Sequence, residues 1–282
     1  MRIGYLGPEG TFSHEAVLAS PAAGGAEHVP LGTNHDVVLA VQDGRVDRAV
    51  APVENLVEGA VNAVLDALAL AAPDVVLTGE LVLPVRHCLV ARGALEPGAV
   101  EAVLSHPQPL AQCAGWLRAN APRARTVPAS STAEAARTVL AQDEPWAAIA
   151  PRGAAERYGA VILAEDIADE PGNATRFVWL ARQEAAGAFP DAGPGAPTKT
   201  SVLFHGAGDG APGWLVRCLS EFAFRGVNLT RIESRPSRQR LGHYAFHVDL
   251  DGAIGQAPVD DAVRALHAHC EEVRVLGSYP AA

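Results

Sequence analysis

The alternation of short apolar runs with helix-like segments over residues 1–180 is the feature that most constrains the fold. We expect strands at residues 3–6, 48–53, 75–77, 100–104, 146–150 and 176–180, and helices at residues 13–19, 34–42, 61–70, 110–119 and 132–141. This alternation is typical of βαβ units. The sequence therefore predicts an α/β domain with a largely parallel sheet.

Residues 181–198 interrupt this alternation. The segment is rich in Ala, Gly and Pro and has no periodicity, so it is predicted to be a linker. Beyond it, strands are expected at residues 200–204, 229–233, 244–250 and 273–276, and helices at residues 213–224 and 259–269. Strand-helix-strand-strand-helix-strand is the ferredoxin-like order. Residues 199–282 are therefore predicted to form a second domain.

Composition excludes several classes of protein. The 282 residues carry a net charge of −10 and no stripe of Lys and Arg, which argues against a nucleic-acid partner. No apolar run is long enough for a membrane-spanning helix. The first strand follows no basic and apolar leader, and the cysteines are scattered, so we expect reduced thiols and a cytoplasmic location.

A glycine-bearing turn at residues 7–10 lies between the first predicted strand and the first predicted helix. It lacks the Lys and the Ser or Thr of a nucleotide-binding P-loop, and it lacks the third glycine of the Rossmann pattern. Backbone N–H groups at a helix N-terminus, together with the Thr11 hydroxyl, suit a carboxylate or another small anion. A plain capped helix start is the alternative interpretation.

Polar residues follow two of the predicted strands. Asn55 comes shortly after the apolar residues 49–51, while Ser105 and Gln112 flank the start of the helix after residues 100–104. Open α/β sheets bind ligands at the carboxyl ends of their strands, so Ser105 and Gln112 are expected to face one cavity. Cys113 lies near a histidine and suggests a nucleophile, but a helical Cys is more often a small buried hydrophobe.

Two further groups of residues leave alternatives. Arg176, at the start of the last strand before the linker, is either a surface charge or a bidentate clamp for a carboxylate. His267 and Cys270 share one face of a predicted helix but supply only two ligands. The sequence therefore predicts no metal site.

Several segments together resemble the prephenate dehydratase family. In chain order they are residues 7–14, 52–55, 105–108 and 131–135 and the triplet Thr175-Arg176-Phe177. Residues 226–236, which include Glu233-Ser234-Arg235-Pro236, resemble the ACT regulatory domain that these enzymes carry. The resemblance covers nearly the whole chain outside the linker.

The resemblance implies a catalytic domain at residues 1–180, the linker at 181–198 and an ACT domain at 199–282. The catalytic domain would have two lobes, as in type II periplasmic-binding proteins, formed by residues 1–78 with 160–180 and by residues 79–159. Substrate would lie between the lobes. By this resemblance the catalytic residues are Asn55, Ser105, Gln112 and Thr175, and the residues lining or supporting the cleft are Thr11, Ser131, Thr132, Arg176 and Phe177.

The implied reaction converts prephenate to phenylpyruvate, with loss of carbon dioxide and water, in phenylalanine biosynthesis. The Thr175 hydroxyl would hydrogen-bond the leaving hydroxyl group. Arg176 would either anchor the pyruvyl carboxylate or form a structural ion pair. Because formation of an aromatic ring drives the reaction, neither a metal nor an organic cofactor is expected.

The ACT resemblance implies phenylalanine as an allosteric effector and a homodimer or homotetramer. The matching effector positions are Gly213, Leu215, Asn228, Glu233, Ser234, Arg235 and Pro236. Two residues depart from the family pattern: Leu56 replaces the usual Ser, and Trp214 replaces the usual Ala, where it is expected to fill part of the effector pocket. A prephenate decarboxylase that forms no aromatic ring, an arogenate dehydratase and a ligand-binding sensor remain as alternatives.

Overall fold

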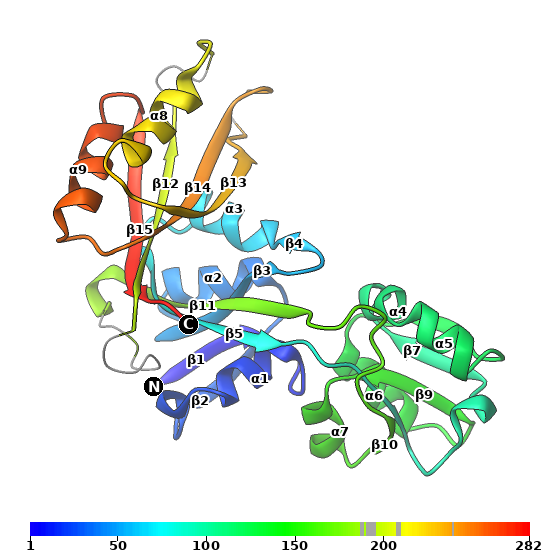
Figure 1. Cartoon of the computed structure of the whole chain (residues 1–282). Helices are drawn as coiled ribbons and strands as arrows, with labels where there is room; N and C mark the ends of the chain where they lie inside the picture. The colour runs from blue at the N-terminus through cyan, green and yellow to red at the C-terminus, as the bar shows by residue number, and fades with distance from the viewer. Residues whose placement is uncertain (187–188, 190–195, 207–209, 239) are drawn as a thin grey trace.

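In the part of the chain that the structure describes, the strands form three β-sheets, two of them side by side and the third set apart (Figure 1). The computed structural model describes residues 1–186, 189, 196–206, 210–238 and 240–282. We call the parts built on these sheets the first lobe, the second lobe and the C-terminal domain. Within the described residues, no helix combines the length and apolar composition needed to cross a membrane.

The first lobe contains a mixed sheet of order β2-β1-β3-β11-β5, with β4 paired to β3. Its strands are β1 Arg2–Leu6, β2 Glu27–Leu31, β3 Arg48–Asn55, β4 Gly59–Ala60, β5 Val75–Pro84 and β11 Ala174–Arg182, and its helices are α1 Phe12–Leu18, η1 Pro21–Ala23, α2 Asn34–Gln42 and α3 Asn62–Leu70. β1 is parallel to β2 and β3, whereas β11 is antiparallel to β3 and β5. The prediction of a largely parallel sheet is therefore wrong, because the chain leaves this lobe along β5 and returns along β11.

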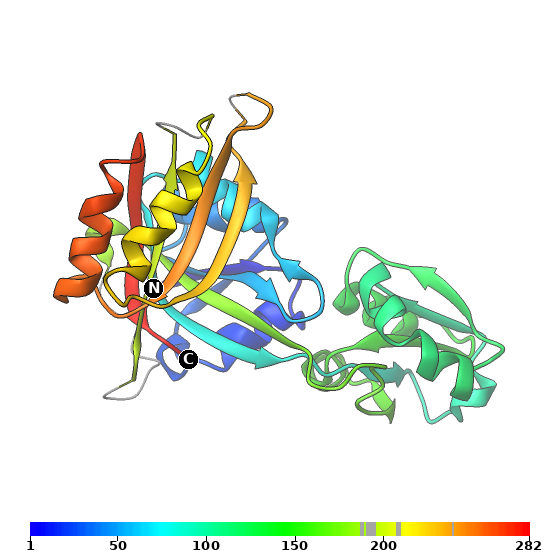
Figure 2. The same ribbon diagram turned by 45° about the horizontal axis from the view of Figure 1, so that its top comes forward.

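The second lobe is also built on a mixed sheet, of order β10-β6-β9-β7-β8. Its elements are β6 Cys88–Ala91, η2 Pro97–Ala99, β7 Ala102–Ser105, α4 Pro107–Gln112, α5 Ala114–Asn120, β8 Arg125–Pro128, α6 Thr132–Leu140, β9 Trp146–Ala150, α7 Arg152–Tyr158 and β10 Val161–Ala164. Figure 2 shows this lobe set apart from the other two sheets, with the chain crossing to it and back.

The crossings correct the expected lobe boundaries. β5 stays in the first sheet as far as Pro84, and β10 still belongs to the second sheet at residues 161–164, so the boundaries at 78/79 and 159/160 are too early. The apolar run ends at Leu77, but the strand continues through three buried residues, 78–80, and then with half-buried and exposed residues in alternation as far as Pro84. Alternation of this kind marks a strand as well as a continuous apolar run does.

The C-terminal domain has the predicted strand-helix-strand-strand-helix-strand order. Its elements are β12 Thr198–His205, α8 Trp214–Ala223, β13 Leu229–Pro236, β14 Tyr244–Asp251, α9 Ala257–Leu266 and β15 Glu272–Pro280. The sheet has the order β13-β14-β12-β15, and all of its pairs are antiparallel. Buried residues of α8 and α9 cover one sheet face.

The other face of the C-terminal sheet packs on the first lobe. Leu203, Leu276 and Tyr279 from this face belong to the same buried core as Val53 and Leu68 of the first lobe. A Cβ added at Gly277 would lie 2.1 Å from the carbonyl oxygen of Leu77 in β5. Only glycine allows so close an approach, so β15 is held directly against β5.

The predicted linker is not entirely structureless. Its start continues β11 to Arg182 and forms η3 Gln183–Ala185, and Phe189 is buried with its ring centroid 4.3 Å from that of Trp179. Residues 187–188 and 190–195 lie outside the described part of the chain. The linker therefore contributes one aromatic side chain to the core of the first lobe.

Some elements differ from expectation. The helix predicted at residues 110–119 is divided into α4 and α5, which meet at Cys113, where φ is −113° and ψ is 9°. Strands β2, β8 and β10 are unpredicted, and each lies at the edge of its sheet with several half-buried or exposed residues. An edge strand needs no continuous apolar run, so it is hard to detect. The buried strand β6 and helix α7 are also unpredicted.

Candidate active site

A cavity of about 790 Å³ lies between the two lobes. Of the nine residues predicted to be catalytic or to line the cleft, the following line it: Thr11, Asn55, Gln112, Ser131, Thr132, Thr175 and Phe177. They come from both lobes: Asn55 and Thr175 lie near strand ends, Ser131 and Thr132 at a helix start, and Gln112 at the end of α4. The cavity is therefore the candidate active site.

Asn55 and Thr175 form the centre of the first-lobe wall. They are opposite each other on the antiparallel strands β3 and β11. The Asn55 Oδ1 atom accepts hydrogen bonds from the backbone N–H groups of Val57 and Glu58, both at 3.0 Å. This fixes the orientation of the amide. The Asn55 Nδ2 atom donates to the Ala174 carbonyl at 3.2 Å and to the Thr175 Oγ1 atom at 2.9 Å.

This arrangement determines which way the Thr175 hydroxyl points. A hydroxyl has one proton to donate, and here its oxygen already accepts a hydrogen bond from the Asn55 amide. In the described structure the Asn55 amide is the hydrogen-bond partner of this hydroxyl, and Thr175 lines the cavity. The Thr175 proton is therefore available to a group bound in the cavity.

Ser105 does not face the cavity, contrary to prediction. Its side chain is fully buried and its Oγ atom donates to the Ile149 carbonyl at 2.8 Å. Ser105 is the last residue of β7, and this bond joins it to the neighbouring strand β9. The serine supports the sheet beneath the cavity, while its neighbour His106 lines the wall.

Arg176 also points away from the cavity. Its Nε atom lies 2.5 Å from Glu80 Oε2, and its Nη1 atom lies 2.6 Å from Asp249 Oδ2. Successive residues of a strand point to opposite faces, so Thr175 and Phe177 reach the cavity while Arg176 reaches the C-terminal domain. Arg176 therefore forms structural ion pairs, the second of the two expected alternatives, and does not line the cavity.

The cavity carries little positive side-chain charge. None of the described residues that line it is Lys or Arg, and Glu58 is the one carboxylate among them. Several helix N-termini lie at its wall instead, including those of α2 at Asn34 and of α6 at Ser131 and Thr132. Helix N-termini carry partial positive charge and free N–H groups. The cavity can therefore hold anionic groups without a strong cation.

Thr11 differs from expectation in one respect. Its hydroxyl donates to the Leu6 carbonyl at 2.8 Å and accepts from the His14 backbone N–H at 3.3 Å. The hydroxyl therefore caps α1 and is occupied on both sides. The N-terminus of the helix, rather than this hydroxyl, remains to face a bound anion.

Gln112 is held by two residues that the sequence analysis missed. The His87 Nε2 atom lies 3.0 Å from Gln112 Oε1, and Gln112 Nε2 lies 3.4 Å from Glu58 Oε1. An amide oxygen only accepts, so Nε2 of His87 carries the proton. Burial lowers the pKa of His87, which keeps the ring neutral. His87 stands immediately before a short apolar run, as Thr175 stands before the strand expected at residues 176–180.

Cys113 is not a nucleophile in this arrangement. It is fully buried, and burial together with Asp169 raises the pKa of its thiol to about 12. The protonated thiol is unreactive, so the interpretation as a small buried hydrophobe is confirmed. All four cysteines are free. Among the described residues, no group of three or more His, Cys, Asp or Glu side chains is placed to hold a metal.

The predicted effector residues are divided between two faces of the C-terminal sheet. On β13, Arg235 Nε lies 2.8 Å from Asp66 Oδ1 of α3, so the arginine faces the first lobe, as does Glu233 two residues before it. Ser234 and Pro236 are exposed on the opposite face, which is the face that α8 covers, with Gly213 as the N-cap of this helix. Within this chain, Glu233 and Arg235 therefore do not join Gly213 in one pocket.

The structure shows where the two residues that depart from the family pattern lie. The Trp214 side chain is buried, packs against Phe204 and Phe246, and donates from Nε1 to the His269 carbonyl at 2.6 Å. It fills the core of the C-terminal domain rather than a surface pocket. Leu56 is 73% exposed and does not line the cavity.

Comparisons with known proteins agree with this architecture. The family model described as prephenate dehydratase matches residues 3–185. The prephenate dehydratase of Mycolicibacterium smegmatis is 40% identical, over 99% of this chain and 90% of that protein. The crystal structure of a prephenate dehydratase from Arthrobacter aurescens in complex with L-Phe superposes with a TM-score of 0.88 at 41% identity, covering 99% of this chain and 90% of that one.

The same fold also occurs in GqqA, which is described as a novel type of quorum quenching acylase. Its structure superposes with a TM-score of 0.84 at 28% identity, covering 100% of this chain and 98% of that one. The match to the family model and the identity to the curated dehydratases are nevertheless decisive. The chain belongs to the prephenate dehydratase family of carbon–oxygen lyases.

Proposed function

We propose that the cavity between the lobes converts prephenate to phenylpyruvate in phenylalanine biosynthesis, with Thr175 as the donor to the leaving hydroxyl. The observation that carries this assignment is the hydrogen bond from Asn55 Nδ2 to Thr175 Oγ1, because it leaves the Thr175 proton free toward the cavity. Hydroxide is a poor leaving group and needs a donor as the C–O bond breaks. One aligned donor in a site shielded from water contributes on the order of 3 kcal/mol, or about a hundredfold in rate.

The charge of the cavity suits the rest of the reaction. Prephenate carries two carboxylates, and one of them leaves as carbon dioxide. A strong cation on the departing carboxylate would oppose its loss, whereas helix N-termini such as those of α2 and α6 orient an anion more weakly. The electrons left by decarboxylation form the aromatic ring as hydroxide departs, so the proposed reaction needs no external oxidant, metal or organic cofactor.

The first test compares the wild type with Thr175→Val and Thr175→Ser. Phenylpyruvate formation from prephenate is followed by its ultraviolet absorbance. We expect Thr175→Val to lower kcat by about a hundredfold and Thr175→Ser, which keeps the hydroxyl, to retain most of it. Unchanged turnover in Thr175→Val would remove Thr175 from the mechanism.

The same assay separates the alternative activities. Prephenate consumed without phenylpyruvate indicates a decarboxylase that forms no aromatic ring. Turnover of arogenate in preference to prephenate indicates an arogenate dehydratase. Binding of prephenate without turnover of either compound indicates a sensor.

We further propose that the C-terminal domain is an ACT domain that binds phenylalanine and controls the activity of a dimer or tetramer. The Arthrobacter aurescens relative was solved with L-Phe, and the βαββαβ order supports the comparison. The exposed residues Ser234 and Pro236 on β13 and the turn at Gly213 remain available to an effector. Initial rates measured with and without phenylalanine, together with the mass of the particle in solution, test this proposal.

A further inference from the structure

Two adjacent strands present their catalytic residues to one face and charged residues to the other. On β11, Thr175 faces the cavity and Arg176 faces the C-terminal domain; on β3, Asn55 and Glu54 divide in the same way. Thr175 is paired with Asn55, and Arg176 with Glu54. Any displacement of Arg176 along or across β11 is therefore passed to Thr175 through one peptide bond.

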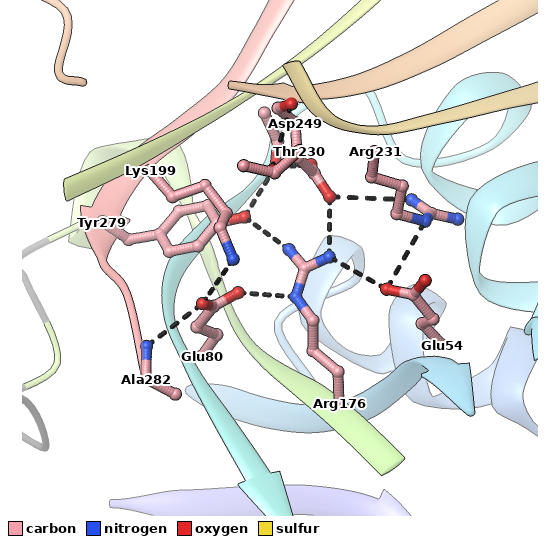
Figure 3. Close-up of polar contacts among 10 residues, drawn as sticks. Glu54, Glu80, Arg176, Lys199, Thr230, Arg231, Asp249, Tyr279 and Ala282 are labelled. Carbon is pink, nitrogen blue, oxygen red and sulfur yellow. Dashed lines mark hydrogen bonds and ion pairs between the residues drawn. The ribbon is translucent and has the colours of Figure 1, made fainter. Parts of the chain in front are cut away.

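The guanidinium of Arg176 is held at each of its three nitrogens (Figure 3). Nε reaches Glu80 of β5 at 2.5 Å, Nη1 reaches Asp249 of β14 at 2.6 Å, and Nη2 reaches the Tyr279 hydroxyl of β15 at 3.0 Å. The planar, forked geometry of Arg allows all three bonds at once, which a Lys side chain cannot reproduce. Of these three hydrogen-bond partners, one belongs to the first lobe and two belong to the C-terminal domain, and Glu54 of the first lobe forms a further ion pair with Nη1 at 3.6 Å.

The surrounding charges are balanced, and those at the centre of the network are buried. Lys199 reaches Glu80 at 2.7 Å, and Arg231 lies 3.8 Å from Asp249 and 3.9 Å from Glu54. Three cations thus face three carboxylates, and the side chains of Arg176, Glu80 and Asp249 are only 10%, 2% and 5% exposed. A buried charge that loses its partner is strongly destabilised. The network therefore specifies the position of Arg176 closely.

We propose that Arg176 is a positioning residue for catalysis: by tying β11 to Asp249 and Tyr279 of the C-terminal sheet, it holds the neighbouring Thr175 hydroxyl in place. Arg176 does not touch the cavity and acts only through Thr175. This inference rests on the proposed role of Thr175 as the donor to the leaving group. The alignment of the Thr175 hydroxyl then depends on the packing of the C-terminal domain against the first lobe.

A second contact between the same two parts of the molecule offers a matched control. Asp66 of α3 accepts from Arg235 Nε at 2.8 Å and from Arg238 Nη2 at 2.9 Å. This ion pair also joins the first lobe to the C-terminal sheet. Asp66 does not line the cavity and lies on a helix rather than on β3 or β11. Its loss weakens the docking without acting directly on Thr175.

The experiment measures kcat and KM for prephenate in Arg176→Lys, Asp249→Asn and the control Asp66→Asn. We expect the first two to lower kcat by about tenfold to a hundredfold, as a small misplacement of a catalytic group does. KM should change little, because Arg176 makes no contact with the cavity. Asp66→Asn should retain the wild-type kcat. An equal fall of kcat in Asp66→Asn would overturn the proposal.

A double-variant comparison distinguishes positioning from general destabilisation. Once Thr175 is replaced by Val, the donor is absent, so adding Arg176→Lys should cause no further loss of kcat. An additional loss of the same size as in the wild-type background would show that Arg176 does not act through Thr175. If Thr175→Val alone has full activity, the proposed role of Thr175 fails instead, and the two failures are distinguishable.

A milder variant guards against misfolding. Tyr279→Phe removes one acceptor of Arg176 and keeps every ion pair of the network. We expect it to lower kcat in the same direction as Arg176→Lys but by less, with the thermal unfolding curve followed by circular dichroism as the check of folding. A folded Tyr279→Phe protein and a folded Asp249→Asn protein that both have the wild-type kcat would contradict the proposal.

Discussion

Asn55→Asp reverses the hydrogen bond at the centre of the candidate active site while hardly changing the size of the side chain. One carboxylate oxygen takes the place of Oδ1 and still accepts from the N–H groups of Val57 and Glu58. The other replaces the Nδ2 donor, 2.9 Å from Thr175 Oγ1. A carboxylate can only accept, so the Thr175 proton now points to residue 55 instead of to the substrate.

The size of the effect follows from this reversal. Loss of one aligned donor costs about 3 kcal/mol in the transition state, so kcat should fall by roughly a hundredfold. The two backbone N–H donors favour the ionised carboxylate, so the reversal should hold at neutral pH. The new oxygen also faces the Ala174 carbonyl, which the amide contacts at 3.2 Å, and this unfavourable pair should lower the free energy of unfolding by about 1–3 kcal/mol.

The assay is phenylpyruvate formation from prephenate, with stability measured by urea denaturation. Asn120→Asp is the control, because Asn120 is an exposed asparagine whose Nδ2 atom donates to the Trp116 carbonyl at 2.9 Å, away from the cavity. It should keep the wild-type kcat. In the Thr175→Val background, Asn55→Asp should have little further effect on kcat. Full turnover by a folded Asn55→Asp protein would refute the reasoning, since the proton of Thr175 would then be unnecessary.

Three further predictions concern stability and the thiol. Phe189→Ala should lower the free energy of unfolding by about 3–5 kcal/mol, because the buried ring stacks on Trp179. The control is Phe224→Ala: Phe224 is 87% exposed, so its replacement should change the free energy of unfolding by less than about 0.5 kcal/mol. Equal effects of the two variants in denaturant titrations would contradict the burial of Phe189. Burial, reinforced by Arg231, lowers the pKa of His247 to about 4. The unfolded chain therefore binds a proton below about pH 6.5 that the folded protein does not bind until about pH 4, so stability should fall by roughly 3 kcal/mol as the pH drops through this window. Denaturant titrations of His247→Gln should lack this part of the pH dependence, and an unchanged profile would count against it. Cys113→Ala should leave turnover of prephenate unchanged, because burial keeps the thiol protonated. Loss of turnover in the folded variant would support the interpretation of Cys113 as a nucleophile.

Much of the cavity could be anticipated from the sequence because its signals are local. Asn55 and Thr175 lie at the ends of apolar runs, and Ser131 and Thr132 stand at the start of an amphipathic segment. Their types and positions indicate strand ends and helix starts without knowledge of the fold. His87 was missed although it also precedes an apolar strand, because no motif was attached to it.

The faces of the strands could not be anticipated in this way. Alternation along β11 requires that Thr175 and Arg176 point in opposite directions, but both faces of this strand are buried, one toward the cavity and one beneath the C-terminal sheet. A sequence pattern distinguishes buried from exposed residues and not one buried environment from another. The same ambiguity applies to Ser105, whose hydroxyl bonds within the sheet.

The sequence by itself determined the order of helices and strands in the C-terminal domain, the family and seven of the residues at the cavity wall, because periodicity, turns and short motifs are properties of neighbouring residues. Only the tertiary structure decided that Arg176 binds Asp249, that Arg235 binds Asp66, and that the first sheet is mixed. Each of these depends on contacts between segments far apart in the chain. Such contacts are selected by the packing of whole sheets, which no local pattern encodes.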